Sequence, residues 1–151
     1  MKMRNTLRIK GRMSLRVLGP DGRVKDERQI DNVITDLGCA HVADQMSDQS
    51  NAALSHMAVG SGTGGTTALN AEEGRVALDS TTQGSGANDN DVVYVAMFPA
   101  GTATAALTEA GIFNDASVGT MFNYAAFAAI NKGASDSLEI TWTVTFADDG
   151  A

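Results

Sequence analysis

The stretch from Leu138 to Phe146, LEITWTVTF, constrains the fold more than any other part of the chain. Apolar residues alternate strictly with glutamate and threonine along it. This period of two predicts a β-strand with one buried face and one solvated face. Because the only tryptophan, Trp142, lies on the apolar face together with Ile140 and Phe146, we expect these three side chains in the core of a β-sheet protein.

Further strands separated by turn residues are predicted along the rest of the chain. Residues 12–30 read as a hairpin around the turn Gly19-Pro20-Asp21-Gly22. Strands are also expected over 54–59, 76–83, 92–98, 106–113 and 120–130. Strands that recur with turns between them favour a β-sandwich or jelly-roll-like fold, and the lack of alternation with long helices argues against a doubly wound fold. We predict a mainly β protein with one β-sandwich domain over residues 12–151.

Only one helix of any length is predicted. Residues 32–47 carry apolar side chains at helical spacing, and Asp31 is placed to cap the first turn. Gly38 weakens this helix by its low propensity. Residues 66–75 are expected to form a single helical turn.

Length and composition exclude several classes of protein. A chain of 151 residues is long enough for one domain with a real core. Its single cysteine, Cys39, excludes an internal disulfide and a cysteine-only metal cluster. No apolar run approaches the roughly 20 residues needed to cross a bilayer, and no apolar segment follows the basic N-terminus as in a secretory signal.

Charge is divided unevenly along the chain. Residues 1–30 hold nine basic and three acidic residues, a balance of +6, whereas residues 31–151 hold two basic and fifteen acidic residues, a balance of −13. We expect residues 1–11 to form a basic N-terminal arm that contacts an acidic protein or a neighbouring copy. The predicted interface residues are Lys2, Arg4, Arg8, Lys10, Arg12 and Arg16. A solvated basic strand is the alternative; an acidic body and an arm without aromatic residues argue against nucleic acid.

The glycine-rich segment after the strand at 54–59 is the main candidate for ligand binding. Gly60, Gly62 and Gly65 match the spacing G-x-G-x-x-G. A dinucleotide site needs these glycines to open a helix, and a phosphate loop needs a lysine after them. Neither feature follows here, so a loop turning a corner of the sandwich is preferred, with a small ligand- or nucleotide-binding module as an alternative.

Other polar residues give weaker signals. The pairs Glu72-Glu73 and Asp89/Asp91 are candidates for a cation site or for solvated loops. Ser55 and His56 are expected on opposite faces of a strand, which argues against a catalytic dyad. We predict no catalytic residue, no cofactor and no metal ligand.

Glu109 stands inside an apolar segment, where a carboxylate needs a partner. Arg75 is one of the two basic residues beyond residue 30. We therefore predict a structural salt bridge between Arg75 and Glu109.

Taken in order, several short motifs resemble a group of small structural proteins of tailed bacteriophage virions. The motifs are His56-Met57-Ala58-Val59-Gly60-Ser61-Gly62-Thr63, Glu73-Gly74-Arg75, Thr108-Glu109-Ala110-Gly111-Ile112-Phe113, Gly119-Thr120-Met121 and the closing strand with Trp142. They correspond to a GTGT loop, an E-x-x-R, an EAG-[LI]-F and an ITW strand. The resemblance covers residues 30–146, with Ser61 interrupting the threonine-rich loop and Gly74 lying in the E-x-x-R region.

This resemblance implies a virion protein that is assembled in the host cytoplasm, is no enzyme and binds no membrane. The reading we favour from it is a capsid decoration, or cement, protein that binds the major capsid protein and forms trimers or dimers. A tail, baseplate or fibre-base accessory protein is the alternative.

Overall fold

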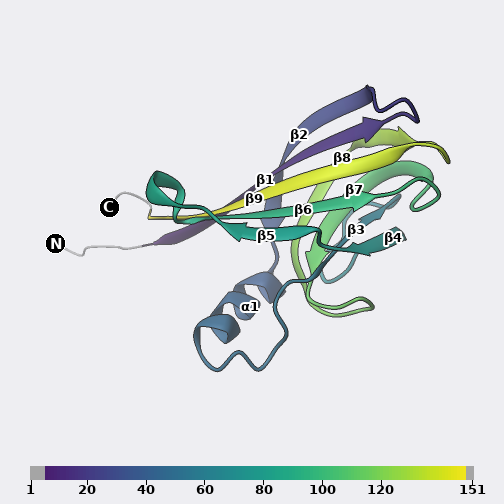
Figure 1. Cartoon of the computed structure of the whole chain (residues 1–151). Coiled ribbons are helices and arrows are strands. Elements are labelled where there is room, and N and C mark those ends of the chain that lie inside the picture. Colours follow the sequence, from purple (N-terminus) through teal and green to yellow (C-terminus); the bar gives the residue numbers. More distant parts are fainter. Residues whose placement is uncertain (1–5, 149–151) are drawn as a thin grey trace.

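The computed structural model describes residues 6–148 as an antiparallel β-sheet with one α-helix beside it (Figure 1). The strands are β1 (Leu7–Leu18), β2 (Val24–Ile34), β3 (His56–Gly60), β4 (Glu72–Ala77), β5 (Ser80–Gln83), β6 (Asp91–Phe98), β7 (Ala105–Phe113), β8 (Met121–Lys132) and β9 (Ser137–Asp148). The helix α1 spans Asp36–Met46, and a short 3-10 helix spans Gly86–Asn88. The prediction of a mainly β, sandwich-like domain with one helix is confirmed.

The sheet is curled, and its two halves are joined at both sides. The strand order is β4-β3-β7-β8-β2-β1-β9-β6-β5. β2 joins the halves on one side, because most of it pairs with β1 while Val33 and Ile34 pair with β8. On the other side, Leu78 and Asp79 connect the end strands β4 and β5: Leu78 N donates to Ser55 O and Asp79 N donates to Val95 O. Strands that pass from one half to the other at a bend are a known way to build the corners of a sandwich.

The core lies between the two halves and contains the alternating face of β9. Ile140 and Trp142 have no exposed surface, and Phe146 is partly buried against the core. The indole Nε1 of Trp142 donates to Asn32 Oδ1 at 2.7 Å. Gly11 on β1 leaves space for this amide, since a Cβ at that position would lie 1.7 Å from Asn32 Oδ1.

Helix α1 begins later than the sequence pattern predicted. Residues up to Ile34 belong to β2, so Asp31 lies exposed on a strand and caps nothing. Thr35 is the N-cap: its Oγ1 accepts from Gly38 N at 2.9 Å and donates to Met121 O at 2.5 Å. This hydroxyl satisfies a free amide of the first turn and also ties the helix to β8.

Two other expectations change with the structure. Residues 72–77, predicted to lie largely in a helical turn, form β4 because they pair with β3. The predicted arm boundary at residue 11 falls inside β1, whose first residue, Leu7, pairs with Asp148 of β9. Within residues 6–148, no helix is both long and apolar enough to span a membrane.

Candidate functional site

The predicted basic interface residues that the structure describes all lie on β1. Arg8, Lys10 and Arg12 are exposed at alternate positions, and Lys10 and Arg12 stand opposite Thr145 and Thr143 of β9. None of the three forms an ion pair with another residue of the range 6–148. We call Arg8, Lys10 and Arg12 the cationic row.

The remaining predicted interface residues behave differently. Arg16 donates to Glu139 Oε1 at 2.9 Å, and this hydrogen bond raises the pKa of the guanidinium. It is therefore already paired within the sheet. Lys2 and Arg4 lie outside the described residues.

Two of the three residues of the cationic row border a shallow hollow of about 540 Å³ on the outer face of the sheet. Lys10 and Arg12 line it, together with hydroxyls of β1 and β9 and two side chains of β2. These other lining side chains are Ser14, Gln29, Asp31, Thr141, Thr143 and Thr145. The threonine face of β9 that was predicted to be solvated is thus a polar surface with two cations at its edge. Such a surface suits carboxylates of a protein partner, which accept hydrogen bonds from both cations and hydroxyls.

A second polar cluster surrounds Glu109, whose side chain has no exposed surface. Its Oε1 accepts from Ala71 N at 2.8 Å and Gly62 N at 3.2 Å, and its Oε2 accepts from Asn70 N at 3.1 Å and Tyr124 Oη at 2.8 Å. A buried carboxylate is tolerated when its lone pairs are satisfied in this way. Glu109 therefore fastens both ends of the loop that connects β3 to β4.

The hydrogen bonds of Glu109 also help to decide whether the glycine-rich segment is a phosphate-binding loop. In a phosphate-binding loop the backbone amides point at the bound anion. Here the amides of Gly62, Asn70 and Ala71 donate to a carboxylate of the protein itself, and Ser61 N donates to Ala71 O. Glu109 of β7 thus supplies the anion for these amides, which favours a structural loop between the paired strands β3 and β4 over a nucleotide site.

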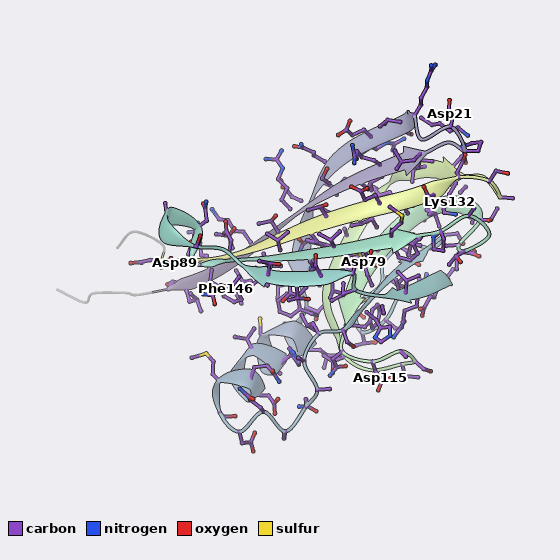
Figure 2. All side chains as sticks on the ribbon, viewed as in Figure 1. Asp21, Asp79, Asp89, Asp115, Lys132 and Phe146 are labelled. Carbon is purple, nitrogen blue, oxygen red and sulfur yellow. The ribbon has the colours of Figure 1, made fainter. Side chains whose placement is uncertain are left out.

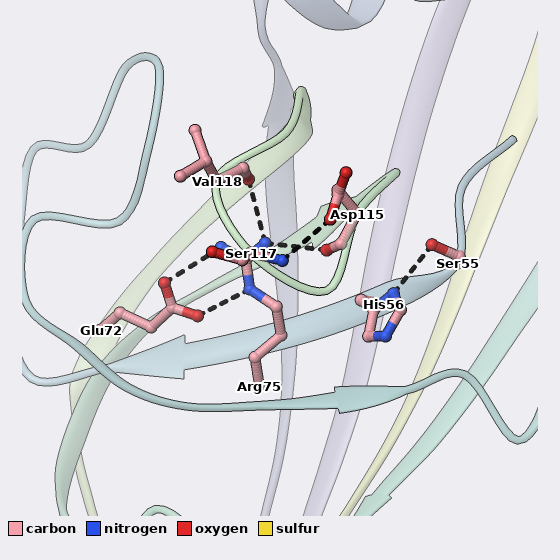
Figure 3. A network of polar contacts seen from close by, with 7 residues as sticks. All are labelled: Ser55, His56, Glu72, Arg75, Asp115, Ser117 and Val118. Carbon is pink, nitrogen blue, oxygen red and sulfur yellow. Dashed lines mark hydrogen bonds and ion pairs between the residues drawn. The ribbon is translucent and has the colours of Figure 1, made fainter. Parts of the chain in front are cut away.

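Arg75 on β4 holds the turn that precedes β8 (Figure 3). Its Nε and Nη2 donate to Glu72 at 2.7 and 3.0 Å, while Nη1 donates to the backbone oxygens of Asp115 and Val118 at 2.9 and 3.0 Å. The guanidinium carbon also lies 3.8 Å from the centre of the Phe113 ring. All three guanidinium nitrogens donate hydrogen bonds within the protein, so the role of Arg75 is to order residues 115–118.

The predicted salt bridge between Arg75 and Glu109 is therefore corrected. Arg75 pairs with Glu72, and Glu109 binds backbone amides and a tyrosine hydroxyl. The physical reason is that neighbouring N–H groups satisfy the carboxylate without a cation, while Glu72 lies on the same strand as Arg75 and within reach.

The short motifs of the sequence meet around these two clusters. HMAVG forms β3, Glu73-Gly74-Arg75 lies in β4, TEAGIF lies in β7, and Gly119-Thr120-Met121 leads into β8. These strands are neighbours in one half of the sheet. The motifs thus contain the residues that hold two loops: Glu109 holds the 61–71 loop, and Arg75 holds the 114–120 turn.

The histidines and the cysteine do not form a common site. Cys39 is exposed on α1, whereas His41 is buried, and burial lowers the pKa of its imidazole. Ser55 Oγ lies 2.8 Å from His56 Nδ1, contrary to the prediction that they face apart, because Ser55 precedes β3 and is not held in strand alternation (Figure 3). Among residues 6–148 there is no group of three or more His, Cys, Asp or Glu side chains that would hold a metal ion.

Comparison with known protein families gives a match. The family model described as "Phage tail-collar fibre protein, N-terminal" matches residues 27–146, which is most of the chain. No curated protein and no solved structure matches.

The family match covers β3, β4, β7 and β8 and the loops that Glu109 and Arg75 hold. It favours the tail or fibre reading over the predicted capsid decoration. The chain belongs to the phage tail-collar fibre N-terminal family and is a tail-associated structural component of a phage virion.

Proposed function

We propose that this chain is a rigid attachment domain that holds a fibre-type component at the phage tail, and that it works by protein–protein contact without catalysis. The cationic row carries this proposal. Arg8, Lys10 and Arg12 are exposed and have no ionic partner in the described structure, although fifteen acidic residues follow residue 30. Cations left unpaired beside a polar face favour an acidic partner, which they steer and orient.

The polar clusters around Glu109 and Arg75 support the same function, because they make the domain rigid. Glu109 and Arg75 form their hydrogen bonds within the protein, with loop backbone groups and with the side chains of Tyr124 and Glu72. Such bonds keep the loops of one half of the sheet in a single conformation, which lowers the entropic cost of binding. A domain that must hold a large appendage benefits from this rigidity.

The partner we propose is an acidic surface of another tail protein or of a neighbouring copy in an oligomeric assembly. Family membership supports the tail location and not the major capsid protein. A tail component is present in few copies per particle, whereas a decoration protein would cover the shell. The amount of this chain relative to the major capsid protein in purified particles therefore tests the location, and a ratio near one would contradict it.

The interface is tested by charge reversal. Particles assembled with Arg8→Glu, Lys10→Glu and Arg12→Glu combined are expected to contain much less of this chain than wild-type particles. Arg12→Glu alone is compared with Arg23→Glu, which changes the same charge in the β1–β2 turn, where Arg23 is highly exposed. Equal incorporation of the triple variant and the wild type would refute the cationic row as the contact.

A further inference from the structure

We propose that the free edge of β5 and the apolar groove beside it bind an extended segment of a partner protein. The segment adds one strand to the sheet, places apolar side chains in the groove and carries basic residues at its two ends. This inference is independent of the cationic row, which lies on the opposite face of the sheet.

The edge itself is open to strand addition. β5 is the last strand of the sheet and pairs only with β6. All four of its residues are exposed, and the sequence Ser-Thr-Thr-Gln has no charge and no proline. Its register with β6 is unbroken, so no bulge turns the edge away. Charged residues, prolines and bulges protect the edges of natural sheets, and β5 has none of them, although its length of four residues limits the ladder that an added strand can form. An unprotected edge is the template used when a peptide adds a strand.

An apolar groove lies directly beside this edge. Its volume is about 430 Å³, and it lies between α1 and the core-facing side of β5, β6 and β9. Thr81 lines it from β5, Tyr94 and Phe146 from the sheet, and Met46 from α1. Met46 is 81% exposed, which is unusual for a side chain of that size. Because Thr81 belongs to both the edge and the groove, every second side chain of an added strand would enter the groove.

Charge defines the ends of the segment. Asp79 immediately precedes β5, and the backbone oxygen of Asp89 accepts from Gln83 Nε2 at 2.7 Å. Figure 2 shows Asp79 and Asp89 on either side of β5 along the sheet. Neither carboxylate forms an ion pair with a cation in the range 6–148. A segment with lysine or arginine at both ends complements this pattern.

The same charges disfavour a second copy as the occupant. If β5 paired with β5 of another copy in antiparallel fashion, Asp79 of each chain would face the Asp89 end of the other. Like charges opposed in this way are destabilising. The occupant is therefore a segment of a different protein.

Strand addition is tested with isotope-labelled full-length chain and the acetylated, amidated peptide KVTVTVK. Amide resonances of β5 and of residues lining the groove are expected to shift on titration. Two further peptides probe the mechanism: EVTVTVE reverses the end charges, and a version N-methylated at alternate residues cannot form the ladder. We expect binding about tenfold or more weaker for EVTVTVE, and none for the N-methylated peptide.

Two variants locate the site on the protein. Gly84 N donates to Asp91 O toward β6, so the alternation of antiparallel bonds directs the amide of Thr81 outward. Thr81→Pro removes this donor and Ala53→Trp fills the groove; each is expected to abolish binding. Thr82→Val, whose side chain faces away from the groove, is the control and retains binding.

Clear results would overturn the proposal. An absence of resonance shifts at millimolar peptide, or shifts only at residues away from β5, would show that the peptide does not bind at this edge. Unchanged binding of the N-methylated peptide would show that no ladder forms. Unchanged binding by the Ala53→Trp variant would show that the groove is not occupied, and this variant is decisive if Thr81→Pro does not fold. Concentration-dependent dimers of the protein alone that Thr81→Pro dissociates would instead identify a second copy as the occupant.

Discussion

At the scale of single residues, the buried side chains of Glu109 and Thr35 each make an identifiable set of hydrogen bonds. Glu109 is the clearest case, because four donors converge on one carboxylate that has no contact with solvent. Removing one partner of a buried polar group costs more than the bond itself contributes, since the remaining groups lose both the bond and their hydration. The loop from 61 to 71 should therefore depend strongly on this one side chain.

Replacing Glu109 by glutamine tests this dependence. The variant Glu109→Gln keeps the shape but places an NH2 group against a backbone donor, so we expect a loss of about 1 to 3 kcal/mol in the free energy of unfolding. Hydrogen exchange of the Asn70 and Ala71 amides should accelerate. Tyr124→Phe removes only one donor and is expected to cost less; a larger loss for Tyr124→Phe than for Glu109→Gln would contradict the account.

His41 gives a prediction about pH. Its side chain is buried, its Nδ1 has no hydrogen-bond partner, and desolvation lowers its pKa from the ordinary 6.5, with Asp44 opposing the shift. The unfolded chain therefore takes up a proton more readily than the folded one. The stability that follows is complete above about pH 6.5 and is lost as pH falls through that value toward the lower pKa of the folded state.

This pH dependence is measured by denaturant unfolding between neutral and mildly acidic pH. The imidazole of His41, followed by NMR, should titrate below 6.5. His41→Leu should flatten the slope of stability in this range. A titration midpoint at or above 6.5 would show that burial does not control this group.

At the scale of elements, α1 shows how tertiary contacts override helix propensity. Gly38 is a poor helix former, and on propensity alone alanine would be better by about 1 kcal/mol. In the structure, however, the Cα of Gly38 packs against β8, and a Cβ would lie 2.0 Å from the backbone oxygen of Phe122. That oxygen also accepts from Thr35 N and cannot move freely.

We therefore expect Gly38→Ala to destabilise the protein, opposite in sign to the propensity. The clash forces α1 away from β8, so unfolding should begin at lower denaturant concentration and the amides of α1 should exchange faster. Ala43→Gly, at an exposed helix position, is the comparison and should cost about 1 kcal/mol by propensity alone. An increase in stability for Gly38→Ala would refute the close packing.

At the scale of the whole molecule, the two halves of the sheet share one core and are joined at β2 and at residues 78–79. Neither half can bury its apolar face without the other. Unfolding should therefore be a single cooperative transition.

Cooperativity is checked with two probes in the same denaturant series. Fluorescence of Trp142 reports the shared core, and far-ultraviolet circular dichroism reports the strands and α1. The two midpoints are expected to coincide within error. Separate midpoints would indicate that the halves are independent units.

The sequence by itself determined the features that depend on local order. The alternation of apolar and polar residues predicted that Trp142 and Ile140 are buried, and the Gly-Pro-Asp-Gly turn predicted the β1–β2 hairpin. Both predictions were possible because a period of two and a tight turn each depend on only a few neighbouring residues. The glycine-rich segment was also predicted correctly to be a loop, but this loop joins the neighbouring strands β3 and β4 and does not turn a corner of the sandwich.

Only the tertiary structure decided which distant groups meet. Glu109 lies 38 residues from Ala71 along the chain, and Thr35 lies 86 residues from Met121. Such partners depend on the order of strands in the sheet, which local patterns do not encode. For the same reason the sequence predicted the wrong partner for Arg75 and the wrong cap for α1, and it gave no sign that the edge of β5 would lie open beside a groove.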